Sequence, residues 1–449
     1  MASILERFKH FPKAAPYIIV TETAERFSYY GMRAILPTFL VTQFYIHSQS
    51  LPDAKAHSNS ICHLFNALVY LLSIGGGLLA DYLLGRYWTI IALGVLYVIG
   101  NAFLTFFSAD YNLFLCGLLL ICIGAGGIKP NVSVMVGDQF EDQNDPNISK
   151  LYDIFYFGIN LGAFFSMMIT PVLKNSSYGA PLAFGVPGVF MFVALVIFVI
   201  GTKKYKLKMP KDAVKEESLP FMEQLKSVWK VLVVFAFIPV YWALYDQNGA
   251  EWVQQAGSMD LNFLGITWIQ EQIQVVNALL ILVMIPIFSF GVYPLLEKIG
   301  IRVSALRKIG WGLISLFITF LLVTWIQTQI DHGIKLSIGW QILAYTLLTV
   351  SEILVSITGL EYAFSQAPKT MKSTIMAVFM LTVFAGNLFD AQVNDSIQSH
   401  GFFGQFTGAS YYLLFSGIVA ANTVLYYIAI WAFKIKDTVA EPHVIDAHA

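Results

Sequence analysis

Charge is what this chain has least of. Only 12% of its 449 residues are charged, whereas 57% are hydrophobic. A typical soluble domain carries about 25% charged residues, so an apolar excess of this size cannot be hidden from water. We therefore expect an integral membrane protein that contacts lipid and has no nucleic-acid partner. The net charge of −1 itself says little about partners.

Cysteine is also scarce. The three cysteines, Cys62, Cys116 and Cys122, lie in apolar segments without metal-ligand spacing, so we expect neither a disulfide framework nor a metal site. The chain has no nucleophile elbow and no Ser/His pair in a suggestive context. These absences argue against an enzyme and against a bound cofactor.

Long apolar windows fill the chain instead and predict an all-α membrane protein with twelve spanning helices. We place them near residues 14–41, 59–83, 87–107, 112–136, 151–173, 182–201, 228–247, 272–296, 306–328, 336–364, 372–396 and 409–433. A lysine-rich stretch divides six spans from six. The predicted organisation is an N-terminal bundle (1–201), a linker (202–227), a C-terminal bundle (228–435) and a tail (436–449). Equal halves of this kind are typical of alternating-access carriers.

Basic residues predict the orientation. If both termini are cytoplasmic, all but six of the 27 Lys and Arg residues fall in cytoplasmic segments. Lys55, Lys174 and Lys335 lie outside, and three more basic residues lie within spans. This distribution satisfies the positive-inside rule and predicts a multi-pass protein of the plasma or inner membrane, with both termini in the cytoplasm.

The first predicted span contains four charged residues, Glu22, Glu25, Arg26 and Arg33. A charge at the centre of a bilayer costs about 2.5–3.5 kcal/mol or more. At roughly 100° per residue, Glu22, Arg26, Tyr29 and Arg33 share one helical stripe. That stripe has to face a polar cavity or opposite charges, so we expect the protein to bind or move a polar solute.

The other ionisable residues within spans divide by sign. The N-terminal half holds the cations Arg26, Arg33 and Lys129, with His63 near the outer end of span 2, whereas the C-terminal half supplies carboxylates and amides. The latter are Asp246, Gln274, Asn277 and Glu352, with Glu361 and Asp390 of unassigned role. A zwitterionic solute would fit between two halves of opposite charge, with its carboxylate towards the cations and its amine towards Glu352.

Aromatic side chains accompany these charges and are candidates for lining pockets that accept variable side chains. They are Tyr29, Tyr30, Tyr70, Tyr156 and Trp242. Packing or an interfacial aromatic belt is the alternative for each of them.

The carboxylates beside buried cations are also candidates for carrying protons. Burial disfavours a carboxylate charge and a paired cation favours it, so separating Glu22 and Glu25 from Arg26 and Lys129 lets a proton bind. A permanent ion-pair network that specifies packing is the alternative. For His63, a proton-binding role and an interfacial position are both open.

Several motifs resemble known transporter signatures. GLLADYLLGR at residues 77–86 resembles the loop signature of the major facilitator superfamily. ETAERFSYY (22–30), GAGGIKP (124–130), GDQF (137–140) and FYFGIN (155–160) resemble signatures of the proton-coupled oligopeptide transporter family. DQNG (246–249), QVVN (274–277), SE (351–352), GLE (359–361) and SQAP (365–368) resemble its seventh, eighth and tenth helices.

This resemblance implies a major facilitator fold and a proton-coupled symporter that imports di- and tripeptides by alternating access. It implies that Arg26, Arg33, Lys129 and Asn160 hold the carboxyl end and backbone of the peptide. Asn277 and Glu352 would then hold its amino end. It implies that Glu22, Glu25 and His63 take part in proton coupling. We expect Asp246 to take part as well, and we expect the protein to be a monomer.

Two departures from the family bear on these expectations. The 202–227 stretch has no room for the two extra helices of many bacterial relatives, and Phe379 replaces a pocket tryptophan, which alters side-chain preference. A carrier of another small anion or amino acid and a non-transporting peptide sensor remain alternatives. Glu352 favours a substrate with an amine over nitrate.

Overall fold

The computed structural model describes residues 11–140, 147–207, 229–359, 362 and 372–435. Within these residues, ten helical segments are long and apolar enough to cross a membrane, which makes the chain a multi-pass membrane protein. One of the ten, Leu51–Phe106, covers two predicted spans, and α2, which contains the four charges, is not among the ten. The count of twelve spans stays a prediction. Glu361, most of the predicted linker and the tail lie outside the described residues.

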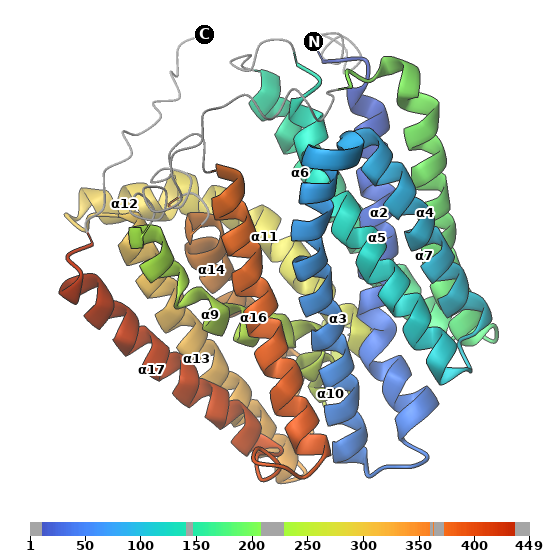
Figure 1. Ribbon diagram of the computed structural model, residues 1–449. Coiled ribbons are helices and arrows are strands. Elements are labelled where there is room, and N and C mark those ends of the chain that lie inside the picture. The colour runs from blue at the N-terminus through green and yellow to red at the C-terminus, as the bar shows by residue number, and fades with distance from the viewer. Residues whose placement is uncertain (1–10, 141–146, 208–228, 360–361, 363–371, 436–449) are drawn as a thin grey trace. The chain divides into compact units, whose positions relative to one another are not determined.

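Within the described residues of the first half of the chain, every regular element is a helix (Figure 1). Its elements are α2 (Ala15–Leu40), η2 (Val41–Tyr45), α3 (Leu51–Leu79), η3 (Ala80–Leu84), α4 (Gly85–Phe106), α5 (Tyr111–Gly137), α6 (Asn147–Lys174), α7 (Gly179–Ile200) and η4 (Gly201–Lys204).

The second half adds shorter helices and one small hairpin. Its elements are α9 (Ile238–Tyr245), η6 (Asp246–Gly249), α10 (Glu251–Ala256), β1 (Asn262–Phe263), β2 (Ile266–Thr267), η7 (Gln270–Gln274), α11 (Val275–Ile287), η8 (Phe288–Val292), α12 (Tyr293–Lys298), α13 (Ala305–Asp331), α14 (Gly339–Glu352), η9 (Ile353–Ile357), α16 (Lys372–Gln398) and α17 (Ala409–Ala432). The two strands pair antiparallel, with Asn262 opposite Thr267.

Contacts divide the chain into two compact units. The first comprises Met1–Glu216, Gln247–Ala278 and Asn387–Gln405, and the second comprises the remaining segments. In the first unit, α4 packs on α5, α2 packs on α6 and α7, and α3 packs on α5. Aromatic rings fill part of its core, where Phe39 lies 5.0 Å from both Phe114 and Phe184 between centroids.

Small residues allow α3 and α5 to approach closely. A Cβ on Gly76 would overlap the carbonyl of Gly126, so glycine is required at that crossing. Pro130 lies inside α5 and cannot donate to that same carbonyl, four residues earlier. Asn131 then joins the helices, because its Nδ2 donates to Gly76 O at 3.1 Å and to Gly127 O at 2.7 Å. This joint fixes the position of Lys129, which immediately precedes the proline.

In the second unit, α13 packs against α14 and α17. The Ser351 hydroxyl donates to Gly312 O at 2.8 Å, and the Tyr426 hydroxyl donates to Leu306 O at 2.8 Å. These two bonds tie both neighbours of α13 to it, whereas α12 runs across the direction of α13 in Figure 1. The π-helical turn η9 follows Glu352 directly, and such turns often mark functional sites.

Two helices extend further than the sequence predicted. The segment predicted to end at residue 247 continues to Ala256 through the 3₁₀ turn η6, so Glu251 lies on a helix rather than in a loop. Helix α3 begins at Leu51, not near 59, because Ser50 caps it by accepting a hydrogen bond from the Asp53 amide. His63 therefore lies about 18 Å along α3 at 1.5 Å per residue.

Candidate functional site

The charges of α2 form one buried cluster within the first unit. Arg26 Nε lies 2.6 Å from Glu22 Oε1 and 2.9 Å from Glu25 Oε2, and all three residues are less than a tenth exposed. Two members of the predicted stripe, Glu22 and Arg26, are therefore ion-paired, and Glu25 joins them. Glu22 Oε2 accepts no hydrogen bond from the described part of the chain, so this oxygen has capacity for a proton or a ligand donor.

Lys129 brings a second cation to this region from α5. Its Nζ lies 3.4 Å from the centroid of the Tyr29 ring and 5.5 Å from that of Tyr70. A cation over an aromatic face gains attraction from the ring quadrupole. The Tyr29 hydroxyl also lies 3.4 Å from Asn66 Oδ1. The structure thus places two predicted substrate-binding residues, Tyr29 and Tyr70, around the ammonium of a third, Lys129.

Other predicted residues of the first unit make backbone contacts. The Asn160 amide donates to Tyr156 O at 2.9 Å, and Gln274 Nε2 donates to Ala34 O at 3.3 Å. Arg33 packs against Gly249, where an added Cβ would lie 3.1 Å from Arg33 Nη2. These contacts fix where the side chains lie, and their roles toward a peptide stay predictions.

In the second unit, Trp242 meets Phe379 edge to face, with ring centroids 5.9 Å apart. Tyr245 stacks on Tyr241 and its hydroxyl hydrogen-bonds to the Glu352 carboxylate. Glu352 therefore lies beside an aromatic group that includes the predicted residues Trp242 and Phe379. Asp246 is buried. Asn277, which belongs to the first unit, is partly buried.

A polar cluster that the sequence analysis missed surrounds His63. Its Nε2 lies 3.0 Å from both carboxylate oxygens of Glu251, and its Nδ1 lies 3.2 Å from Asn387 Oδ1. Asp390 Oδ2 lies 3.7 Å from the same Nδ1, and Asn394 Nδ2 donates to Glu251 Oε1 at 3.0 Å. No local pattern in the sequence indicates this cluster, because Glu251 lies 188 residues from His63.

A second missed contact joins Lys174 at the end of α6 to Glu271 in η7. Lys174 Nζ also donates to the Thr38 hydroxyl at 2.7 Å, and the same hydroxyl donates to Glu271. The Glu271 side chain is almost fully buried. Lys174 is only partly buried, whereas the buried Glu271 requires a partner, which the sequence alone does not identify.

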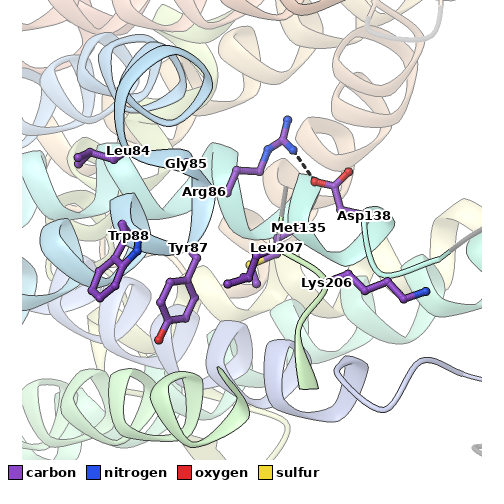
Figure 2. Close-up of a pocket in the computed structure, with 9 residues that line it drawn as sticks. All are labelled: Leu84, Gly85, Arg86, Tyr87, Trp88, Met135, Asp138, Lys206 and Leu207. Carbon is purple, nitrogen blue, oxygen red and sulfur yellow. Dashed lines mark hydrogen bonds and ion pairs between the residues drawn. The ribbon is translucent and has the colours of Figure 1, made fainter. Parts of the chain in front are cut away.

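A pocket lies beside the loop that resembles the major facilitator signature (Figure 2). There Arg86 donates to Asp138 and lies 3.3 Å from Asp81 Oδ1. The adjacent Gln139 accepts from the Lys206 amide at 2.9 Å and donates to Lys206 O at 3.5 Å. The beginning of the predicted linker is thus held to the end of α5.

No group of three or more His, Cys, Asp or Glu side chains could hold a metal ion within the residues that the structure describes. What these clusters can do chemically is bind protons, carboxylates and amines.

Comparison with known proteins places the chain in a family. The model of the POT family matches residues 87–222 and 217–407. Solute carrier family 15 member 1 of Homo sapiens is 35% identical over 382 residues, which cover 72% of this chain and 53% of that protein. Solute carrier family 15 member 2 of Danio rerio is 34% identical over 368 residues, covering 72% and 50%. The chain spans about half the length of these curated relatives.

Solved structures agree with the sequence comparison over nearly the full chain. The POT family transporter PepTSo is 33% identical, with a TM-score of 0.87 and coverage of 95% of this chain and 99% of that one. An auto-inhibited POT family peptide transporter is 30% identical, with a TM-score of 0.85 and coverage of 95% and 98%. The chain therefore belongs to the POT family, which is a family of transporters and not of enzymes.

Proposed function

We propose that this protein is a proton-coupled symporter that imports di- and tripeptides by alternating access. The observation that carries the proposal is the buried cluster of Glu22, Glu25 and Arg26 in α2, with Lys129 nearby on α5. Ionisable groups inside a membrane helix are costly and mark the path of a polar solute or a proton. The auto-inhibited relative is a POT family peptide transporter, and this similarity supports a peptide as the solute.

The cationic members of this cluster are suited to the carboxyl end of a peptide. A guanidinium binds both oxygens of a carboxylate, and an ammonium adds a point charge. Tyr29 and Tyr70 face Lys129 with their rings, and its ammonium is a candidate partner for an anionic group of the peptide. We assign Arg26, Arg33 and Lys129 to the peptide carboxylate and Asn160 to the peptide backbone.

Glu352 is suited to the amino end. Its carboxylate already accepts the Tyr245 hydroxyl, and a carboxylate has capacity for further donors. Trp242 and Phe379 supply apolar surface for a neighbouring side chain. We assign Glu352 and Asn277 to the amino group, with Gln274, Tyr30 and Tyr156 as further lining residues.

Proton coupling is assigned to Glu22, Glu25, His63 and Asp246. Two carboxylates on one guanidinium leave a negative charge that a proton or a cation has to compensate. We further propose that the chain crosses the membrane twelve times as a major facilitator protein, with both termini in the cytoplasm, and works as a monomer.

Uptake into proteoliposomes tests this function. A labelled dipeptide should accumulate when the outside is acidic and the interior is alkaline, and a protonophore should abolish the accumulation. Unlabelled di- and tripeptides should compete, whereas a free amino acid and nitrate should not. Accumulation of nitrate or of a free amino acid in place of the dipeptide would assign the chain to another solute, and peptide binding without any flux would support a sensor.

A further inference from the structure

The His63 cluster contains two carboxylates with no role in the assignments above. Glu251 lies on α10 and Asp390 lies on α16, and both belong to the same compact unit as His63 on α3. His63 is 1% exposed, Glu251 5% and Asp390 0%. Three ionisable groups this deeply buried have to compensate one another, because a lone charge in such surroundings is strongly unfavourable.

The geometry around the ring indicates its protonation state. Both oxygens of Glu251 lie at 3.0 Å from Nε2, and oxygens of Asn387 and Asp390 lie at 3.2 and 3.7 Å from Nδ1. Oxygen acceptors at both nitrogens need a hydrogen on each nitrogen. A neutral imidazole has one N–H, whereas the imidazolium has two, so the arrangement fits the charged ring.

The neighbouring helices hold the two carboxylates in place. Asn394 lies one helical turn after Asp390, and its amide donates to Glu251 at 3.0 Å and to the Asp390 carbonyl at 3.0 Å. Gln254, on the same short helix as Glu251, donates to Asn59 of α3 at 2.7 Å. The charged neighbours of the ring are Glu251 and Asp390, and Arg33 lies further off against Gly249.

We propose that Glu251 and Asp390 are positioning residues that keep a proton on His63, so that α3, α10 and α16 together form one proton-binding site of the transporter. The inference rests on the proposed proton-coupled function. A proton from water adds to the lone pair of the neutral ring, whose charge rises from 0 to +1. When α3 separates from α10 and α16, the ring loses both carboxylates and returns the proton to water.

The two carboxylates should stabilise the protonated His63 ring to different extents. Both oxygens of Glu251 lie at hydrogen-bond distance from Nε2. On the other side of the ring, Asp390 Oδ2 lies 3.7 Å from Nδ1, which is 0.5 Å farther than Asn387 Oδ1. Because opposite charge within about 4–6 Å favours the charged form by one to three pH units, loss of Glu251 should have the larger effect.

The first test is the pH profile of dipeptide uptake into proteoliposomes. In Glu251→Gln, the alkaline limb of the profile should move to lower pH by about one unit or more, and in Asp390→Asn by less. Glu251→Asp keeps the charge and should stay near wild type. Asp395→Asn, which removes an exposed carboxylate from the same helix, should leave the profile unchanged. A lower rate with no displacement of the limb would overturn the proposal.

A second test does not require transport. In purified protein with ¹⁵N-labelled histidine, the His63 ring signal is assigned by its absence in H63Q. Its titration should move to lower pH in Glu251→Gln and not in Asp395→Asn. An unchanged titration refutes the positioning role even if uptake is proton-driven. A displaced titration in a protein that shows no proton-driven uptake leaves the site standing and refutes the proposed function.

Discussion

At the scale of single residues, α2 sets one guanidinium against two carboxylates. Arg26 lies within 3 Å of both Glu22 and Glu25, in a segment whose other side chains are mainly apolar. A full charge on both carboxylates leaves an excess of one negative charge, which Lys129, a substrate or a proton has to compensate. Under the proposed function, this imbalance would favour the binding of a proton or of a cationic group at the cluster.

Neutralising these carboxylates should separate exchange from accumulation. Glu22→Gln or Glu25→Gln keeps the shape of the side chain but removes the group that accepts the proton. We expect gradient-driven accumulation of a dipeptide to fall at least tenfold, while counterflow exchange with a peptide inside partly survives. Glu297→Gln, at an exposed carboxylate, serves as the control. Full accumulation in the Glu22→Gln/Glu25→Gln double variant contradicts this assignment.

Glu352 should distinguish a free amino terminus from a blocked one. An ammonium that leaves water needs a charged partner, and Glu352 is the carboxylate proposed for that role. Competition binding should show that Glu352→Gln weakens a dipeptide with a free amine roughly tenfold or more, with little effect on its N-acetylated analogue. An equal loss for both ligands would mean that Glu352 acts on the proton or on gating instead.

At the scale of elements, the crossing of α3 and α5 positions Lys129. Gly76→Ala places a Cβ on the Gly126 carbonyl and should destabilise the protein by about 1–3 kcal/mol, as overpacking does. Gly77→Ala is the matched control, since a Cβ there meets nothing within 4 Å. Thermal unfolding in detergent checks this difference. Equal melting temperatures for the two variants would show that the helices can move apart without cost.

The Gln139 side chain is a second element-scale feature, since it holds Lys206 by two backbone hydrogen bonds. Gln139→Leu removes both bonds, each worth about 1 kcal/mol. Hydrogen exchange at residues 205–207 should then become roughly tenfold faster. Gln392→Leu, on the exposed face of α16, should leave the exchange there unchanged. Unaltered exchange in Gln139→Leu would show that other contacts hold this segment.

At the scale of the whole molecule, the sequence predicted a helical membrane protein and the pairing of opposite charges in α2, because apolar windows and a charged stripe are local patterns. It did not predict Glu251, because Asp246, Asn248 and Gly249 resemble the end of a helix, whereas the 3₁₀ turn carries the helix on. The start of α3 was available from the sequence, since Ser50 and Asp53 have the spacing of a capping pair.

Local sequence patterns do not predict which distant segments pair with each other. His63 and Glu251 are far apart in the chain, and so are Lys174 and Glu271. A single sequence shows that each buried charge needs a partner, but it does not show which partner. The family resemblance implied roles only for residues that lie within, or match, the family motifs. Glu251 and Asp390 lie outside the quoted motifs and therefore stayed unassigned.

Proton movement driven by peptide tests the central claim most directly. Proteoliposomes that contain a pH-sensitive dye are prepared with equal pH on both sides, and a dipeptide is then added outside at high concentration. The account predicts that the interior acidifies as peptide enters, that N-acetylated peptide acidifies it less, and that the Glu22→Gln/Glu25→Gln double variant shows no acidification. Peptide entry in the wild type without any change in internal pH would contradict proton-coupled symport.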